Sequence, residues 1–588
     1  MAGSSGNEET QGWIKFFRQT LHPLFGLVAV ACLLTLVGWT GDVTTLLHWV
    51  TCGTGVAFAM ERAWVYFEDK LPRNERKRLK IHLSLAVLVL LTSIILMILP
   101  LSSLGDTAIA SHIFIQIAVL VSSLASMIYH QTRFTARAFH PGLVLIFSFL
   151  ALILAGTLLL MMPRCVAPGN TCTWLDALFT ATSAVCVTGL TVQNSATFFS
   201  LTGQVVILLL IQTGGLGIMT LTFFAAVVLF EGLSLHDRLL LGKMLSENRL
   251  ARIGQTLSFI VAFTFIIEGI GAVILFMSLD SIPDLGTRAF HSVFHAVSAF
   301  CNAGFSTLPD GLASEAVRGN GIWQIVVMVL IVIGGLGALV CEDISQWVMA
   351  MIRLRKEKTG PRPRLKVHSR LVLSVTAGLI IIGALGIFIS EFLFGNGPQN
   401  GGVILTSFFH SVTARTAGFN TVPMSQINLL TAEFLMLLML IGGSPGGTAG
   451  GMRTTVFAVG IAHVWSQLRM SRRGIIAFNR RIPPELGAQA LGLMVLTGVW
   501  LIINLMILIA LESGKSINES ELLFELISAF ATVGLSLDLT PLLTPESQIL
   551  LTVNMFVGRI GLLTVLATLI PPDTYPSSGK PPEKILLI

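Results

Sequence analysis

Four short segments of this chain each contain a glycine at a nearly constant spacing, and their backbone carbonyls could bind a cation. The intervals between the glycines are 115, 114 and 116 residues. A ring of backbone carbonyls can replace the hydration shell of a monovalent cation, and glycine reaches the positive φ that turns consecutive carbonyls to one side. We therefore expect cation chemistry based on backbone oxygens. The four reference glycines are Gly189, Gly304, Gly418 and Gly534.

The residues that flank these glycines repeat as well. A phenylalanine stands ten residues before each glycine, a large apolar residue follows it directly, and a small polar residue comes two positions after it. Scattered glycines that ease helix packing would not share such neighbours, so we interpret the four segments as one repeated unit. The phenylalanines are Phe179, Phe294, Phe408 and Phe524, and the small polar residues are Thr191, Ser306, Asn420 and Ser536.

Each unit is expected to contain an outer helix, a half-length helix of about 14 residues that is too short to span a membrane, an extended segment and an inner helix. Irregular backbone at membrane depth survives only where protein or a water-filled path satisfies it. Four such segments around one axis would form a filter, with the negative ends of the four short helices pointing at the ion. The expected ion-binding residues are Val187, Thr188, Gly189 and Leu190; Asn302, Ala303, Gly304 and Phe305; Thr416, Ala417, Gly418 and Phe419; and Thr532, Val533, Gly534 and Leu535.

A second glycine match lies farther along each unit, at QTGGLGIMT, VIGGLGALV, IGGSPGGTAGGMR and VGRIGLL. Its first glycines are Gly214, Gly334, Gly442 and Gly558. The third copy holds six glycines and a proline within eleven residues, which cannot keep a continuous helix. We therefore expect an intramembrane loop directly below the filter. Its residues are Gly442, Gly443, Ser444, Pro445, Gly446, Gly447, Thr448, Ala449, Gly450 and Gly451.

The composition places these segments in a membrane. Of 588 residues, 53% are apolar and only 12% are charged, and the mean hydropathy is +0.81, which excludes large soluble domains. We expect an all-α polytopic protein with twelve spans. These lie near 24–40, 46–67, 82–101, 113–130, 141–162, 203–230, 255–279, 321–350, 371–394, 431–465, 487–511 and 546–570.

The net charge of +6 becomes a sidedness signal when it is read by position. Lys and Arg gather in the connections near 70–80 and 353–370, whereas 102–112, 193–202 and 537–547 contain none. The positive-inside rule then places both termini in the cytoplasm. The expected divisions are an N-terminal extension at 1–140, pore repeats at 141–254, 255–370, 371–486 and 487–570, and a cytoplasmic tail at 571–588.

The motifs VTGL, NAGF, TAGF and TVGL, together with the GGSPGGTAGG run, resemble the Trk, Ktr and HKT superfamily of potassium transporters over about 141–588. The resemblance implies four repeats around a central pore in a bacterial inner membrane, potassium uptake, and a gating loop at Gly442 to Gly451. It also implies a homodimer and a cytosolic nucleotide-binding regulatory subunit with RCK domains. A glycine in all four filters goes with potassium in this superfamily, although one glycine per filter suggests looser discrimination, so sodium permeation or sodium coupling stays open as the alternative.

Arg559 is the charge most out of place, because it lies in the fourth inner helix where the other repeats have glycine. A cation at that depth must face water or a partner. It is either a structural ion pair or, as the resemblance also implies, a gate residue that contacts the loop and repels cations. We expect Arg453 to fix the end of the loop and Arg415, within the third short helix, to support the filter from behind. We assign Glu268, Glu391 and Glu525 an architectural role.

Other functions find less support in the sequence. HExxH, a GxSxG at a helix start and nucleotide-binding fingerprints are absent, so we expect neither an enzyme nor a covalent cofactor, and no nucleic-acid partner. His291 and His295 stand four residues apart but lack a third metal ligand. Cys165 and Cys172 lie in an outward loop, where they either form a disulfide or remain thiols.

Overall fold

The computed structural model describes most residues between 141 and 569 and a smaller share of those before 141. The described residues are 44–67, 86–95 and a few positions between 28 and 119, then 141–217, 253–357, 363–394, 403–469, 475–478, 480–515 and 517–569.

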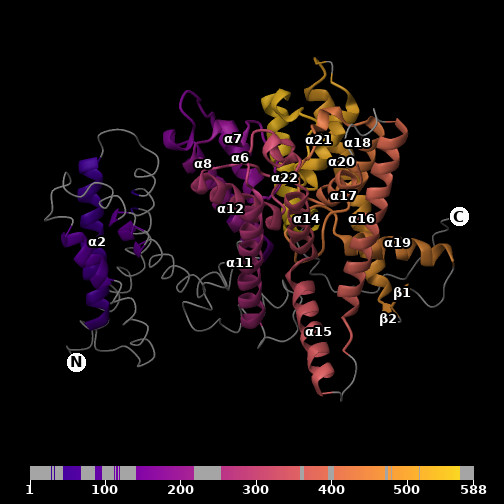
Figure 1. Cartoon of the computed structure of the whole chain (residues 1–588), viewed down its shortest axis with the longest axis horizontal. Coiled ribbons are helices and arrows are strands. Elements are labelled where there is room, and N and C mark those ends of the chain that lie inside the picture. Colours follow the sequence, from indigo (N-terminus) through magenta and orange to yellow (C-terminus); the bar gives the residue numbers. More distant parts are fainter. Residues whose placement is uncertain are drawn as a thin grey trace, which may run out of the picture.

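Four consecutive stretches of the chain have the same order of elements: a long helix, a short helix, an extended segment and another helix (Figure 1). In the first stretch these helices are α5 (Pro141–Leu160), α6 (Trp174–Val185) and α8 (Leu201–Leu216). The second has α11 (Ile253–Ser278), α12 (Leu285–Cys301) and α14 (Gly321–Leu336), the third α16 (Val367–Phe394), α17 (Val403–Thr413) and α18 (Leu429–Leu440), and the fourth α20 (Pro484–Leu511), α21 (Glu519–Phe530) and α22 (Pro545–Ile560).

Polar caps fix where several of these helices begin. Thr173 and Asp176 form a reciprocal capping box at the start of α6, and Asp284 accepts a hydrogen bond from the backbone of Thr287 at the start of α12. The N-cap residues Ser200 and Asn320 do the same for α8 and α14. Such caps satisfy the free N–H groups of the first turn, so the short helices start at defined positions.

The four stretches close into a ring. The last helix of each stretch packs against the short helix of the next: α8 against α12, α14 against α17, and α18 against α21. The cycle is completed by α22, which packs against α6 of the first stretch. The extended segments after the short helices therefore meet at one axis.

Three helices among the described residues are long and apolar enough to span a membrane, within α11, α16 and α20. The span expected at 321–350 is not straight, because α14 and α15 (Ala338–Glu357) meet at an angle of 99°. The chain turns at Gly337, where φ is +84°. A similar glycine, Gly561 with φ +95°, separates α22 from α23 (Leu562–Leu569).

The all-α expectation also needs an amendment. After α19 (Thr454–Leu468), the strands β1 (Ile475–Ala477) and β2 (Arg480–Ile482) form an antiparallel hairpin in the connection expected at 466–486. In the N-terminal extension, α2 (Thr44–Phe67) lies where a span is expected, and its buried Phe58 belongs to a separate apolar cluster with Val89 and Ile115. Most of the extension and the tail at 571–588 lie outside the described residues.

Candidate functional site

The four reference glycines form a closed ring of close contacts. A Cβ added to Gly189 would lie 2.4 Å from the carbonyl oxygen of Ala303 and 3.0 Å from Cα of Gly304. The same test on Gly304 gives 2.8 Å to the oxygen of Ala417, and on Gly418 gives 2.4 Å to the oxygen of Val533. A Cβ on Gly534 would lie 2.1 Å from the oxygen of Thr188, which closes the ring. No side chain can be accommodated at these positions without moving a neighbouring carbonyl.

The backbone of all four segments takes an unusual path that the sequence does not reveal. Each reference glycine has positive φ, between +70° and +95°. The residue two positions earlier has positive φ as well, although three of these four residues are β-branched, for which such a conformation is rare and costly. They are Val187 (+57°), Asn302 (+60°), Thr416 (+73°) and Thr532 (+51°). Two left-handed residues therefore flank the residue whose carbonyl contacts the next glycine.

A hydroxyl near the end of each short helix ties the helix to its extended segment. Ser183 Oγ accepts from the backbone N–H of Gly189 at 3.0 Å, and Ser528 Oγ accepts from that of Gly534 at 3.1 Å. In the other two repeats, Ser298 donates to the carbonyl of Phe305 and Thr413 donates to that of Phe419, both at 2.8 Å. The helix ends thus lie directly behind the ring.

The third repeat has a different register from the one expected. Its hydroxyl, Thr413, stands five residues before the reference glycine, whereas the other three stand six residues before it. The phenylalanine match at Phe408 is accordingly wrong: its side chain is 41% exposed, and Phe409 is the fully buried equivalent of Phe179 and Phe294. The third short helix is therefore displaced by one position along the sequence relative to its reference glycine.

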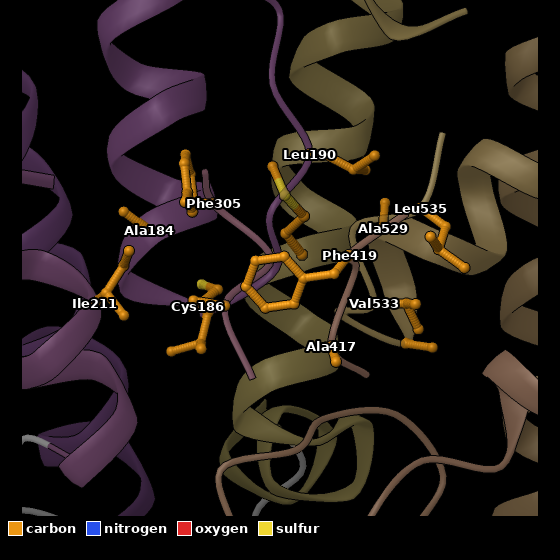
Figure 2. Close-up of a cluster of buried hydrophobic side chains, with 14 of the residues drawn as sticks. Ala184, Cys186, Leu190, Ile211, Phe305, Ala417, Phe419, Ala529, Val533 and Leu535 are labelled. Atoms are coloured by element: carbon orange, nitrogen blue, oxygen red, sulfur yellow. The ribbon is translucent and has the colours of Figure 1, made fainter. Parts of the chain in front are cut away.

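The extended segments are buried except at the glycines. Each reference glycine is partly exposed, and the residues immediately before and after it are buried. The apolar side chains that follow the glycines are buried in one apolar cluster, in which Figure 2 shows Leu190, Phe305, Phe419 and Leu535. The backbone, not the side chains, therefore lines the centre of the ring. All sixteen expected filter residues belong to these four segments.

A cavity of about 620 Å³ lies on one side of the ring and reaches all four glycines. It is also lined by the exposed side chains of Asp310, Glu315 and Asp538, with Arg318 as the basic residue among the described lining residues. We call this cavity the outer vestibule. Its excess of acidic side chains favours the entry of cations.

The inner helices approach the short helices closely through the second set of glycines. A Cβ on Gly214 would lie 2.0 Å from the carbonyl oxygen of Val185, and the same contact recurs between Gly334 and Phe300 and between Gly558 and Phe530. Glycine is therefore required for this packing in three repeats. Gly442 does not share the contact, because the third inner helix has already ended at Leu440.

The segment Gly442 to Gly451 is a loop that is fixed between α18 and α19. Ser444 donates from Oγ to the carbonyls of Gly335 and Leu336 at 2.7 and 2.6 Å, and Thr454 N–H donates to Gly443 O at 3.0 Å. A Cβ on Gly450 would lie 2.1 Å from Thr532 Oγ1. The loop therefore lies directly against the filter segments, on the side opposite the outer vestibule.

Arg559 connects this loop to the first repeat. Its Nη1 donates to the carbonyl of Thr448, and its Nη2 donates to the carbonyl of Gly214 at 2.7 Å. Among the described residues, no acidic side chain lies within ion-pair distance of Arg559. The guanidinium lines a cavity of about 250 Å³ together with Arg453, Gly447 and Thr448.

Two further arginines and two glutamates singled out in the sequence lie near the short helices or the loop. Arg415 lies in the turn after α17, not within the helix as expected, and its Nη2 donates to Thr376 Oγ1 and to Gly442 O, both at 3.4 Å. Arg453 is the exposed N-cap of α19. Glu268 accepts from Gln212 at 3.2 Å, and Glu391 accepts from Thr431 at 2.6 Å. All of these contacts are compatible with an architectural role.

Cys165 and Cys172 are free thiols in the structure. Burial raises the pKa of each to about 11, and the neighbouring carboxylate of Asp176 adds to the effect on Cys172. A disulfide between the two residues stays a prediction. His291 and His295 bind hydroxyls of their own filter segment, and no cluster of three or more metal-ligand residues occurs in the described part of the chain.

Comparison with known proteins identifies the family. The family model described as TrkH, cation transport protein, matches residues 105–577. The chain belongs to this family. It is 36% identical over 433 residues to the Ktr system potassium uptake protein B of Bacillus subtilis, covering 72% of this chain and 92% of that protein.

A further relative supports the same assignment, and a solved structure has the same fold. The potassium/sodium uptake protein NtpJ of Enterococcus hirae is 34% identical over 454 residues, which cover 75% of this chain and 95% of that protein. The crystal structure of the potassium transporter TrkH from Vibrio parahaemolyticus has the same fold, with a TM-score of 0.59 at 16% identity, covering 89% of this chain and 98% of that one. The resemblance of the sequence to the Trk and Ktr superfamily is thereby confirmed.

Proposed function

We propose that this TrkH-family membrane protein takes up potassium, and that the cation passes through the ring of Gly189, Gly304, Gly418 and Gly534. The observation that carries the proposal is the closed cycle in which each glycine lies against a backbone carbonyl of the next repeat. Only backbone oxygens and small residues line the centre of this ring, and such oxygens replace the hydration shell of a monovalent cation.

The cation enters from the outer vestibule. Among the described lining residues, Asp310, Glu315 and Asp538 outnumber Arg318 and give this cavity a net negative charge, which raises the local cation concentration. Beyond the vestibule, the carbonyl-terminal ends of α6, α12, α17 and α21 carry partial negative charges of about half an elementary charge each. These ends contribute electrostatic stabilisation to an ion that has lost part of its water.

The loop from Gly442 to Gly451 acts as the gate. It lies against Thr532 of the fourth filter segment and is held by Ser444 on one side and by Arg559 on the other. The guanidinium also places a positive charge beside the ion path, which opposes the passage of cations. Opening requires that these hydrogen bonds break and that the loop move away from the axis.

The remaining parts of the proposal concern the assembly. From the resemblance of its sequence to the Trk and Ktr superfamily, we place it in a bacterial inner membrane as a homodimer. The positive-inside rule places both termini in the cytoplasm. A separate cytosolic nucleotide-binding subunit with RCK domains controls the gate. The transported ion is the only cargo, and no covalent cofactor takes part.

Uptake of ⁸⁶Rb⁺ into proteoliposomes, with and without a sodium gradient, tests this function. Wild-type protein should take up Rb⁺ without a sodium gradient. Gly534→Ala should abolish uptake because its Cβ would displace the Thr188 carbonyl, whereas the matched Gly498→Ala has open space around it and should transport normally. Absence of wild-type uptake under both conditions would refute the proposal.

Sodium coupling is the second candidate, because the relative NtpJ is named a potassium/sodium uptake protein. Uptake of Rb⁺ that depends strictly on a sodium gradient would favour this alternative. Uptake of ²²Na⁺ by the wild type in the absence of potassium would instead indicate a ring that discriminates weakly between the two ions.

A further inference from the structure

The four short helices do not make the same hydrogen bonds to their filter segments. Each short helix has a buried side chain three residues before the hydroxyl that binds its extended segment. These side chains are Thr180, His295, His410 and Glu525. In the second and fourth repeats this side chain contacts the second residue after the reference glycine, Ser306 or Ser536. The first and third repeats have Thr191 and Asn420 at that position.

In the second repeat, the histidine at this position on the short helix is hydrogen-bonded to the filter segment. His295 Nε2 lies 2.9 Å from Ser306 Oγ, while its Nδ1 lies 2.7 Å from the carbonyl oxygen of His291. His291 adds a contact of 2.5 Å between its Nδ1 and Thr307 Oγ1. Two imidazoles therefore hold the outer half of this segment against α12.

In the fourth repeat a carboxylate takes the same place. Glu525 Oε1 accepts from Ser536 Oγ at 2.6 Å and from the backbone N–H of Leu537 at 3.0 Å. Its Oε2 accepts from Thr540 Oγ1 at 2.6 Å. Three hydrogen bonds converge on this side chain, which is fully buried.

The first and third repeats lack this tie. Thr180 Oγ1 and His410 Nε2 are buried without a hydrogen-bond partner. Asn420 donates within its own segment, to Val422 O at 3.2 Å. The first repeat has a contact only farther out, where Gln193 Nε2 lies 3.3 Å from Asp176 Oδ1.

The two repeats that have this hydrogen bond lie opposite each other in the ring. Gly189 lies next to Gly304 and Gly534, so the second and fourth repeats are opposite each other, as are the first and third. We infer that His295–Ser306 and Glu525–Ser536 are positioning contacts that hold the filter segments of the second and fourth repeats rigid. The segments of the first and third repeats adapt to the ion. The rigid pair sets the discrimination between potassium and sodium. This inference rests on the proposed function of the ring.

The physical reason is the difference in size between the ions. A filter that selects by the number and position of its carbonyls needs segments that do not collapse onto the smaller sodium ion. Loss of one of these hydrogen bonds lets its filter segment move toward the axis of the ring, which improves the coordination of sodium more than that of potassium. A net hydrogen bond contributes about 1 kcal/mol, so the selectivity change per tie should be about fivefold.

Competition of Na⁺ with ⁸⁶Rb⁺ uptake in proteoliposomes measures this effect. Ser306→Ala and Ser536→Ala should each lower the Rb⁺/Na⁺ permeability ratio about fivefold. Thr191→Ala, at the equivalent position of an untied repeat, is the matched control and should keep the wild-type ratio. Glu525→Gln should also keep it, because the amide oxygen still accepts from Ser536 and Leu537 while the amide nitrogen can donate to Thr540.

The outcomes separate this inference from the proposed function. A merely structural role would lower thermal stability or total flux but leave the permeability ratio unchanged. Wild-type uptake together with an unchanged ratio in both serine variants, or an equal change in Thr191→Ala, would overturn the inference and leave the proposed function intact. Lack of wild-type uptake would overturn both.

Discussion

Replacement of Arg559 by alanine should open the pore. The wild-type guanidinium donates to Thr448 O in the gate loop and to Gly214 O in the first repeat. A hydrogen bond from a charged donor contributes about 1.5–3 kcal/mol, so the closed state loses about 3–6 kcal/mol as an upper bound. In addition, a cation at roughly 6 Å from the guanidinium is repelled by about 3 kcal/mol at an effective dielectric constant of about 20.

Either contribution alone predicts a rise in Rb⁺ flux of at least about tenfold, since 1.4 kcal/mol corresponds to a factor of ten. The assay is ⁸⁶Rb⁺ uptake into proteoliposomes that contain Arg559→Ala or wild-type protein at equal density. Arg559→Lys separates the two contributions, because it keeps the charge but cannot reproduce both hydrogen bonds of the fork. Its flux should lie between those of the wild type and the alanine variant.

A matched control is Arg469→Ala, because Arg469 is exposed at the end of α19 and lies outside the proposed gate. Its flux should equal that of the wild type. An Arg559→Ala protein that is folded, as judged by its elution from size exclusion, and that transports at the wild-type rate would refute the proposed gate role.

Three further predictions follow from single contacts. Ser444→Ala removes a hydroxyl whose single proton lies between two carbonyls of the second repeat and should raise Rb⁺ uptake severalfold, while an unchanged rate would show that the loop is held elsewhere. Burial of Glu512 acts to raise its pKa, but hydrogen bonds from neighbouring hydroxyl and backbone groups and the Lys515 ammonium hold it at about 2. Because this value is below that of the unfolded chain, the stabilisation is complete above about pH 5 and is lost as pH falls toward 2, by up to about 3 kcal/mol; the melting temperature of Glu512→Gln should lack this pH dependence. Because Cys165 is fully buried, labelling is done after unfolding in denaturant: maleimide should then label Cys165 and Cys172 only after reduction if the disulfide forms, and labelling without reductant would exclude the disulfide.

The ring of glycines could be predicted from the sequence because its central requirement is steric. A Cβ at any reference glycine meets a carbonyl of the next repeat, so glycine must recur at each position, and the recurrence is visible as a spacing. The second glycine set could be recognised for the same reason, since Gly214, Gly334 and Gly558 each lie against a carbonyl of a short helix.

Features that depend on backbone geometry were not visible in the same way. Val187 and Thr532 are residue types that rarely adopt positive φ, so their types give no indication of the turn that the fold imposes on them. The one-residue shift of the third repeat was also missed, because Phe408 meets the ten-residue spacing and only burial shows that the adjacent Phe409 is the equivalent residue. The bend at Gly337 was missed because an apolar run predicts length but not direction.

The central claim, that backbone carbonyls of four repeats bind the transported ion, is tested most directly by locating that ion. Anomalous diffraction from crystals soaked in Rb⁺ should give a peak on the axis of the ring formed by Gly189, Gly304, Gly418 and Gly534. The peak should disappear when Rb⁺ is replaced by Na⁺ at the same concentration. A protein that takes up Rb⁺ in proteoliposomes but shows its only Rb⁺ peaks away from this ring would contradict the account.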